Sequence, residues 1–404
     1  MNAQIFTGLK VADFTWAAAG PIMTKQLADN GATVVKIESR KHPDSMRLGG
    51  PFAGETPGID RSGFFADFNS SKLSVALDMT RPEGRAVALR LAAWADIVAD
   101  SFRPGILDRW GLGYAALRET NPALIMISSS LYGATGPWKD HPGYGAQGAA
   151  LAGIHGLTGW PDRPPAAPKG AYTDSVTPRY GLAALVAALI HRERTGEGQR
   201  IELSQVEAGV EFLAPEILRL QVSGEQVRRR GNRGEGSLLH GVYPCAGEDR
   251  WIAIEARDRT EWDAVVGVLG DLGEPGEGEP GEGEPGAPGA EGLDGRVAAA
   301  TAGHDAFELA AKLRAAGAPA GVVARGSDLF EDPILRERDH FRPLRHREMG
   351  TVGYNGPAYR FSATPTVLTS AAPCLGEHTD EVLEGLLGYS RDEVMALRDQ
   401  GILQ

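Results

Sequence analysis

Residues 9–38, LKVADFTWAAAGPIMTKQLADNGATVVKIE, contain the pattern that decides the fold. Short apolar runs at residues 9–14 and 32–38 predict buried strands, and residues 22–30 between them predict a helix. A strand, a turn, a helix and a second strand form a βαβ unit, whose right-handed crossover makes the two strands parallel. The turn at residues 15–21 lacks GxGxxG, so it only weakly supports dinucleotide binding, but its small residues let a ligand approach the backbone.

The alternation of strands and helices continues along the chain and predicts an α/β fold. Further strands are expected at residues 74–77, 96–99 and 124–129, with a helix at residues 84–94. Later segments predict a smaller α/β region, with a hairpin at 241–244 and 251–255, helices at 260–269 and 307–316, and a strand at 320–323. Between them, residues 272–288 (LGEPGEGEPGEGEPGAP) are of low complexity, which predicts a disordered surface insertion.

The amino-acid composition excludes several classes of protein. The 404 residues are 42% hydrophobic and 23% charged, which is ordinary for a globular protein with a sizeable core. A net charge of −12 argues against nucleic acid as the main partner. Two cysteines are too few for a disulfide framework or a cysteine-built metal site. Neither a signal peptide nor a membrane-spanning run is apparent, so we expect a cytoplasmic enzyme without a metal.

One acidic residue, Asp174, stands out in residues 169–209, KGAYTDSVTPRYGLAALVAALIHRERTGEGQRIELSQVEAG. It follows a proline-rich run, so we expect it in a loop that leads into an amphipathic helix at residues 180–194. Pro178 suits the first turn of that helix. Two interpretations are open: Asp174 caps the helix, because aspartate is a favoured capping residue, or it is a carboxylate that a ligand approaches.

This stretch resembles the class III CoA-transferases, the carnitine and bile-acid CoA-transferase (CaiB/BaiF) family. The family writes an aspartate in a small-residue loop, then "ALxxRxxTGxGQ", a strand and "SxxEA". Here these parts are Ala188, Leu189, Arg192, Thr195, Gly196, Gly198, Gln199, Ser204, Glu207 and Ala208. In that family the aspartate is the catalytic nucleophile, so the resemblance implies this role for Asp174. It also implies acyl-CoA and a small carboxylic acid as substrates, with no tightly bound cofactor.

Further motifs of the family occur along the chain. The first turn matches "AGPxxxxxLaxxGAxVIKIE", and residues 102–105 match the "FRPG" of "NFRPGxxxRLGL". Arginine at such a turn suits the phosphates of CoA. The resemblance implies that CoA contacts Ala18, Ala19, Ser39, Arg40, Leu77, Ser101, Phe102, Arg103, Arg109 and Tyr144. Ser101 replaces the usual asparagine, and Gly145 replaces the aspartate that commonly follows the tyrosine at 144.

Tyr144 bears on an alternative within the superfamily. The acyl-CoA racemases resemble these transferases but use a histidine and an aspartate as paired bases, and their histidine aligns with Tyr144. Tyrosine, with an ordinary pKa near 10, is a poor base at neutral pH, so the racemase is the second interpretation. An intramolecular CoA-transferring isomerase and a subunit of a heteromeric transferase also stay open.

The resemblance also implies a domain organisation. We expect residues 1–209 to begin a large Rossmann-like, CoA-binding domain, and residues 210–234, with a helix at 210–222, to link it to a small α/β domain at 235–328. Residues 329–404 then return to the large domain, whose parallel sheet is built from both chain ends. The family forms interlocked dimers, so a homodimer is expected, with a heteromer of paralogues as the other possibility and no nucleic acid or membrane partner.

Overall fold

The computed structural model describes residues 3–275 and 292–404, and the chain divides into two compact units. The first comprises Met1–Gly153, Lys169–Ala214 and Pro333–Gln404. The second comprises Ile154–Pro168 and Pro215–Asp332. The domain limits proposed from the sequence stay predictions beside this division.

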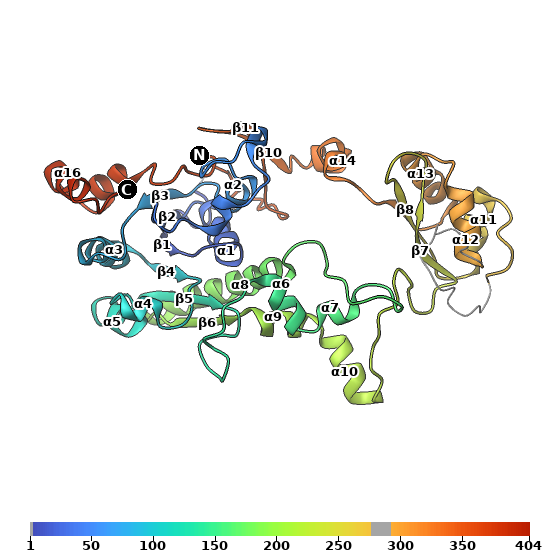
Figure 1. The fold of residues 1–404 in the computed structure, drawn as a ribbon, viewed down its shortest axis with the longest axis horizontal. Helices are drawn as coiled ribbons and strands as arrows, with labels where there is room; N and C mark the ends of the chain where they lie inside the picture. The colour runs from blue at the N-terminus through green and yellow to red at the C-terminus, as the bar shows by residue number, and fades with distance from the viewer. Residues whose placement is uncertain (1–2, 276–291) are drawn as a thin grey trace. The chain divides into compact units, whose positions relative to one another are not determined.

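A six-stranded parallel sheet forms the centre of the first unit, in the order β3-β2-β1-β4-β5-β6 (Figure 1). The strands are β1 (Lys10–Phe14), β2 (Thr33–Glu38), β3 (Leu73–Ala76), β4 (Ile97–Asp100), β5 (Ile125–Ser130) and β6 (Arg200–Ser204). The order reverses between β1 and β4, which makes this the switch point of a doubly wound sheet, where such folds bind ligands. The predicted α/β, Rossmann-like fold is confirmed.

Helices cover both faces of the sheet, because the central strands are buried on both sides. On one face, α1 (Ala19–Ala28) and α8 (Tyr172–Thr195) pack together on the strands. A Cβ on Gly181 of α8 would lie 2.5 Å from the sulfur of Met23 in α1, so glycine is needed for this close approach.

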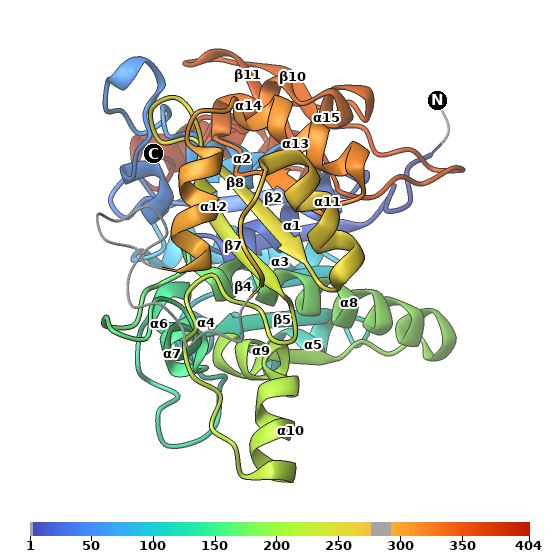
Figure 2. The ribbon, with the colours of Figure 1, turned by 90° about the vertical axis from the view of Figure 1, so that its right-hand side faces the viewer.

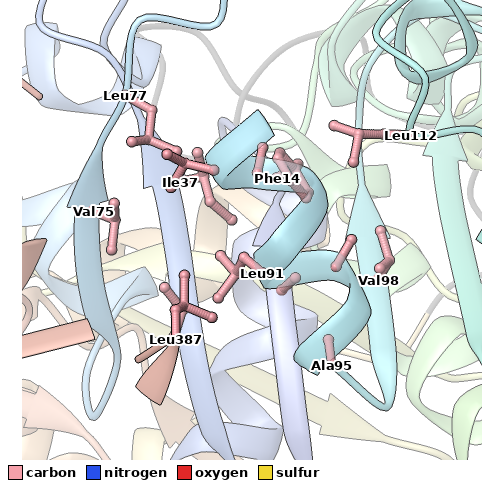
Figure 3. Packing of buried hydrophobic residues seen from close by; sticks show 14 of the residues in the cluster. Phe14, Ile37, Val75, Leu77, Leu91, Ala95, Val98, Leu112 and Leu387 are labelled. Carbon is pink, nitrogen blue, oxygen red and sulfur yellow. The ribbon is translucent and has the colours of Figure 1, made fainter. Parts of the chain in front are cut away.

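The other face holds a larger core, in which α3 (Pro82–Trp94) packs on the strands (Figure 3). The C-terminal part of the chain adds Val382, Leu383, Leu387, Val394 and Leu403 to this core. Both chain ends therefore build the first unit, as predicted. The sheet itself differs from the prediction, because all six of its strands lie between residues 10 and 204 and the return segment adds helices instead.

The remaining elements of the first unit surround this core. They are α2 (Gly63–Phe68), α4 (Ile106–Arg109), α5 (Tyr114–Thr120), α6 (Gly145–Leu151), α9 (Gln205–Phe212), α15 (Pro333–Glu337), α16 (Arg391–Asp399), a π-helix at Glu381–Leu386 and two short 3-10 turns at Ser45–Leu48 and Ala53–Glu55. Strands β10 (Phe341–His346) and β11 (Gly350–Asn355) form a separate antiparallel hairpin.

The second unit is built on an antiparallel three-stranded sheet, β7-β8-β9, with helices packed against it (Figure 2). Its elements are β7 (Leu239–Pro244), β8 (Trp251–Ala256), β9 (Ala320–Val322), α7 (Ile154–Leu157), α11 (Arg259–Leu269), α12 (Leu293–Thr301), α13 (Ala306–Ala316) and α14 (Gly326–Glu331). Helix α10 (Ala214–Ser223) begins at the junction of the two units. The predicted hairpin and helices of this region are confirmed.

The structure corrects the start of the predicted insertion. Leu272 is only 2% exposed and joins the core of the second unit, and its carbonyl oxygen accepts a hydrogen bond of 2.6 Å from Nε of Arg296. An apolar side chain next to a buried core is held there by burial, whatever the composition that follows it. The rest of the predicted insertion from residue 276 onward lies outside the described residues.

Three predicted helices begin or end elsewhere. Helix α1 begins at Ala19, within the predicted turn, because Pro21 is tolerated in a first helical turn. The single helix predicted at residues 210–222 is two helices, α9 and α10, since Pro215 has no N–H with which to continue α9. Helix α8 begins at Tyr172, eight residues before its predicted start, and contains Pro178.

None of the helices in the described residues combines the length and the apolar character that a membrane crossing requires.

Candidate active site at the carboxyl edge of the sheet

The candidate site lies where the parallel strands end. The turn between β1 and α1 and the turn after β4 meet at the switch point, and α9 follows the end of β6. Helix α8 crosses back before β6, so its N-terminus lies at this same carboxyl edge. Asp174 stands in the first turn of α8. The topology thus brings Asp174 and the predicted CoA-binding turns to one edge of the sheet.

The surroundings of Asp174 overturn two expectations. It lies inside the helix rather than in the preceding loop, and it does not cap α8, whose N-cap residue is Ala171. Its side chain is 7% exposed and bonds to groups of two other helices. Oδ2 accepts a hydrogen bond of 3.2 Å from the backbone N–H of Gly145, and Oδ1 accepts one of 3.1 Å from Nε2 of Gln205.

Burial determines the acidity of this carboxyl. It raises the pKa of Asp174 to about 6, and the hydrogen bonds from Gly145 and Gln205 lower it only in part. Neither donor carries a charge. The carboxylate is therefore ionised at neutral pH but is more basic than an ordinary aspartate, which favours its use as a nucleophile.

Gly145 explains how α6 reaches Asp174. A Cβ at this position would lie 2.5 Å from Cγ of Asp174 and 2.6 Å from its backbone nitrogen, so only glycine permits the contact. Thr173 holds the other backbone polar group of this glycine, because its Oγ1 donates a hydrogen bond of 2.9 Å to the carbonyl oxygen of Gly145. The replacement of the common aspartate by Gly145 thus has a direct steric consequence at Asp174.

The turn between β1 and α1 is held by a buried ion pair. Asp44 accepts the N–H of Ala17 at Oδ1 (2.9 Å) and the ammonium of Lys36 at Oδ2 (2.9 Å). Lys36 also donates to the carbonyl oxygen of Thr15 (2.6 Å), and both charged side chains are fully buried. Ala17 has φ of 63°, a left-handed conformation that an alanine adopts only when its surroundings impose it.

Ser101 and Phe102 join the two turns at the switch point. Oγ of Ser101 accepts the N–H of Trp16 (2.7 Å) and donates to its carbonyl oxygen (3.2 Å). The ring of Phe102 packs edge-on against Trp16 and Trp110, with centroids 5.3 and 5.5 Å apart. Ser101 and Phe102, in the turn after β4, therefore contact the turn between β1 and α1. Ala18 and Ala19 are buried where α1 begins.

The three predicted arginines are exposed at the same edge. Arg103 precedes α4 in the turn after β4, Arg109 is the last residue of α4, and Arg40 follows β2. Arg40 lines a cavity of about 410 Å³ together with Arg347 and Arg398, although acidic side chains line it too. Exposed guanidinium groups of this kind are available to the phosphates of a ligand.

The other predicted contacts differ in accessibility. Ser39 is buried and its Oγ donates to Oε1 of Gln404 (2.8 Å), so it is already engaged by the C-terminus. The side chain of Leu77 is fully buried in the core, which leaves only its backbone for a ligand. Tyr144 is 56% exposed and immediately precedes Gly145, so its ring is free to contact a substrate near Asp174.

The sequence pattern of CoA-transferase family III matches residues 6–379. The chain belongs to this family. Succinyl-CoA–D-citramalate CoA-transferase of Chloroflexus aurantiacus is 30% identical to it, over 95% of this chain and 94% of that protein. The succinyl-CoA–L-malate CoA-transferase beta subunit of the same organism is 29% identical, over 98% and 97% of the two chains. A crystal structure of a CaiB/BaiF family protein from Brucella suis covers 96% of this chain and all of its own, with 30% identity and a TM-score of 0.82.

Two residues of the candidate site, Gln205 and Asp44, were not predicted from the sequence. Gln205 lies between Ser204 and Glu207, which carried the family motif, but 31 residues separate it from Asp174. Asp44 lies in a polar loop that gave no signal of its own. The only sequence clue to Gln205 was a polar residue directly after a predicted strand, at the edge where ligands bind.

Across residues 3–275 and 292–404, no group of three or more His, Cys, Asp or Glu side chains is arranged to hold a metal ion.

Proposed function

We propose that this chain transfers CoA from an acyl-CoA donor to a free carboxylic acid through covalent intermediates on Asp174. The observation that carries the proposal is the environment of Asp174: a buried carboxylate at the ligand-binding edge of the sheet, held by uncharged donors. Family membership supports CoA thioesters as substrates.

The reaction starts when an Asp174 oxygen attacks the thioester carbon of the donor. The carbon–sulfur bond breaks, CoA leaves as a thiolate, and a mixed anhydride joins Asp174 to the donor acyl group. The thiolate then attacks Cγ of Asp174 and expels the donor acid as a carboxylate, which leaves an aspartyl-CoA thioester. No proton is transferred in either step, so a nucleophile that is ionised at neutral pH is sufficient.

The second half reverses these steps with the acceptor. Its carboxylate attacks Cγ of the aspartyl thioester and releases the CoA thiolate, giving a second anhydride. The thiolate attacks the acceptor acyl carbon, the bond to the aspartyl oxygen breaks, and the new acyl-CoA leaves. Asp174 is regenerated as a carboxylate. Splitting one difficult exchange into such steps is the advantage of covalent catalysis.

The contacts of Asp174 favour transfer over racemisation. A racemase needs a second base across the substrate from the aspartate. The two groups bonded to Asp174 are a backbone N–H and an amide, and neither accepts a proton at neutral pH. Tyr144 is exposed and stands where the racemases place their histidine, so this chain lacks the imidazole base at that position.

For the substrates, we propose succinyl-CoA as the donor and a dicarboxylate as the acceptor. The two relatives named above use succinyl-CoA according to their names, and their acceptors are the dicarboxylic acids citramalate and malate. The exposed arginines at residues 40, 103 and 109 offer sites for the phosphates of CoA. No further cofactor enters the proposed reaction.

For the assembly, we propose the interlocked homodimer implied by the family resemblance. The name of one relative, a beta subunit, makes a heteromer with a paralogue the alternative. Light scattering of the purified chain distinguishes them: a species of twice the chain mass supports the homodimer, and a monomer that gains activity only with a second chain supports the heteromer.

A transfer assay tests the function. The protein is incubated with succinyl-CoA and, in separate reactions, with a panel of free mono- and dicarboxylic acids, and new acyl-CoA is measured by chromatography. Acyl-CoA formation that needs both substrates and is lost in Asp174→Ala supports the proposal. Product formed from one acyl-CoA alone, without any acid, would instead support a racemase or an isomerase.

A further inference from the structure

The side chain of Gln205 is a buried amide at the candidate nucleophile. Gln205 is the first residue of α9, directly after β6, and is 8% exposed. Its Nε2 donates the hydrogen bond of 3.1 Å to Oδ1 of Asp174. This is a contact with an atom that reacts in the proposed mechanism, made by a residue that no family motif in the sequence singled out.

Thr173 determines which way the amide faces. Its Oγ1 lies 3.3 Å from Oε1 of Gln205 and 2.9 Å from the carbonyl oxygen of Gly145, so one hydroxyl proton is shared between two acceptors. With Oε1 toward this hydroxyl, the NH₂ group faces Asp174. The opposite orientation would place the amide oxygen against the carboxylate, where two acceptors repel each other. The donor is therefore preset toward Oδ1.

The two carboxylate oxygens of Asp174 differ in how closely neighbouring atoms confine them. Oδ2 lies beneath the backbone of Gly145, so close that a Cβ on this residue would be 2.7 Å from it. The backbone of Gly145 therefore crowds Oδ2 on this side, and its N–H occupies one lone pair of that oxygen. Oδ1 instead faces the amide at the end of the Gln205 side chain, which moves more readily than the backbone. Oδ1 is thus the less confined of the two oxygens for attack on a substrate carbon.

We propose that Gln205 is a catalytic residue that aims Oδ1 of Asp174 at the thioester carbon, while the N–H of Gly145 retains Oδ2. This inference rests on the proposed CoA transfer. When Oδ1 attacks, its charge moves to the thioester oxygen and the bond to CoA sulfur breaks. Oδ2 stays on Cγ as a carbonyl oxygen. When thiolate or acceptor carboxylate then attacks Cγ, Oδ2 takes the negative charge, and the fixed N–H of Gly145 stabilises it.

Single-turnover acylation of Asp174 by succinyl-CoA tests this role. Adduct formation is followed by rapid quench and mass spectrometry of the full-length protein, from pH 5 to 8. Gln205→Met keeps the size of the side chain but removes the donor, and Gln205→Glu replaces the donor by an acceptor. The exposed Gln400→Met is the matched control for the substitution itself. Melting temperatures confirm that each variant is folded.

We expect Gln205→Met to slow acylation by about 100-fold, the loss that a misplaced reacting group causes, because Oδ1 is no longer held in position for attack. The acid limb of the pH profile should move to higher pH, since a bond that favours the ionised carboxylate is lost, and it should move further in Gln205→Glu because of like-charge repulsion. Thr173→Val, which releases the amide but leaves the donor, should give a smaller loss. The control should match the wild type.

Two results would overturn the inference alone: acylation of Gln205→Met within about twofold of the wild type, or slower acylation with an unmoved acid limb, which would indicate a merely structural role. If one Gln205 variant does not fold, the other and Thr173→Val give the same readout. If the wild-type protein forms no adduct with any acyl-CoA, the proposed function falls, and this inference falls with it.

Discussion

Asp13 and Asp174 are both buried carboxylates near the carboxyl edge of the same sheet, yet their surroundings are opposite. Asp13 accepts hydrogen bonds from Thr15 and Thr24 and pairs with the ammonium of Lys72 at 3.0 Å. Burial alone would raise its pKa, but Lys72 and Lys36 bring the net pKa below the ordinary value. Asp174 has no cationic partner in the part of the chain that the structure describes, and burial raises its pKa to about 6.

The difference distinguishes a carboxylate that stabilises the fold from one that is suited to act as a nucleophile. A carboxylate with paired cations and hydroxyl donors is a poor nucleophile, because its charge is already neutralised, but it anchors a turn well. The Lys36–Asp44 pair acts in the same way on the strained turn at Ala17. Asp174 keeps its basicity because its two donors are neutral.

The largest effect is expected from Asp174→Asn. The amide preserves the size of the side chain but removes the nucleophile, so the rate of CoA transfer should fall at least ~10³-fold, as for other covalent catalysts that lose theirs. Steady-state transfer rates measure this, with circular dichroism as the check on folding. A folded variant with more than a tenth of wild-type activity would remove Asp174 from the mechanism.

Lys72→Met should damage the fold rather than the chemistry of Asp174. It leaves Asp13 charged and fully buried without its ammonium, which costs about 3–5 kcal/mol in the free energy of unfolding. Urea denaturation measures the loss. The exposed pair of Lys139 with Asp140 supplies the control, since Lys139→Met should cost no more than about 1 kcal/mol. Equal losses in the two variants would contradict the anchoring role of Asp13.

The stability of Asp174→Asn relative to the wild type should depend on pH. A carboxyl whose pKa rises from 3.8 to about 6 on folding destabilises the folded chain when ionised, by up to ~3 kcal/mol. The penalty is absent below pH 3.8, grows toward pH 6 and is complete above it. The stabilisation by asparagine should therefore be larger at pH 7.5 than at pH 5. A pH-independent difference in urea midpoints would indicate an ordinary pKa for Asp174.

The smallest effect is expected at the exposed arginines. Arg103→Gln and Arg109→Gln should each raise the KM for the acyl-CoA by about tenfold and leave kcat nearly unchanged, because a phosphate contact far from the thioester binds ground state and transition state alike. Arg118→Gln, exposed on α5, is the control. A fall in kcat without a change in KM would show that these side chains do not act through ground-state binding.

Much of the fold was predictable from local patterns. Apolar runs and the right-handed crossover were sufficient for five of the six strands of the parallel sheet, and the family motifs indicated the sixth strand and pointed to Asp174. The start of α8 was not predictable, because Pro178 and the small residues before it resemble a loop, whereas packing against α1 and α6 makes the segment helical. Tertiary contacts override local propensity in such segments.

The remaining part of the site depends on contacts between distant residues. Gly145 looked like a departure from the family pattern, and only the structure shows it against Cγ of Asp174. Gln205 meets Asp174 across 31 residues, and Asp44 meets Ala17 across 27. A single sequence carries no record of these pairs, since neither periodicity nor composition reports which side chains face each other.

Covalent trapping is the most direct test of whether CoA transfer proceeds through Asp174. The protein is incubated with succinyl-CoA, treated with hydroxylamine or borohydride, and digested for mass spectrometry. Modification of the peptide at Asp174 is expected in the wild type, and none in Asp174→Ala. An unmodified Asp174 with every acyl-CoA tried, together with solvent-proton exchange at the acyl α-carbon, would contradict it and favour a racemase.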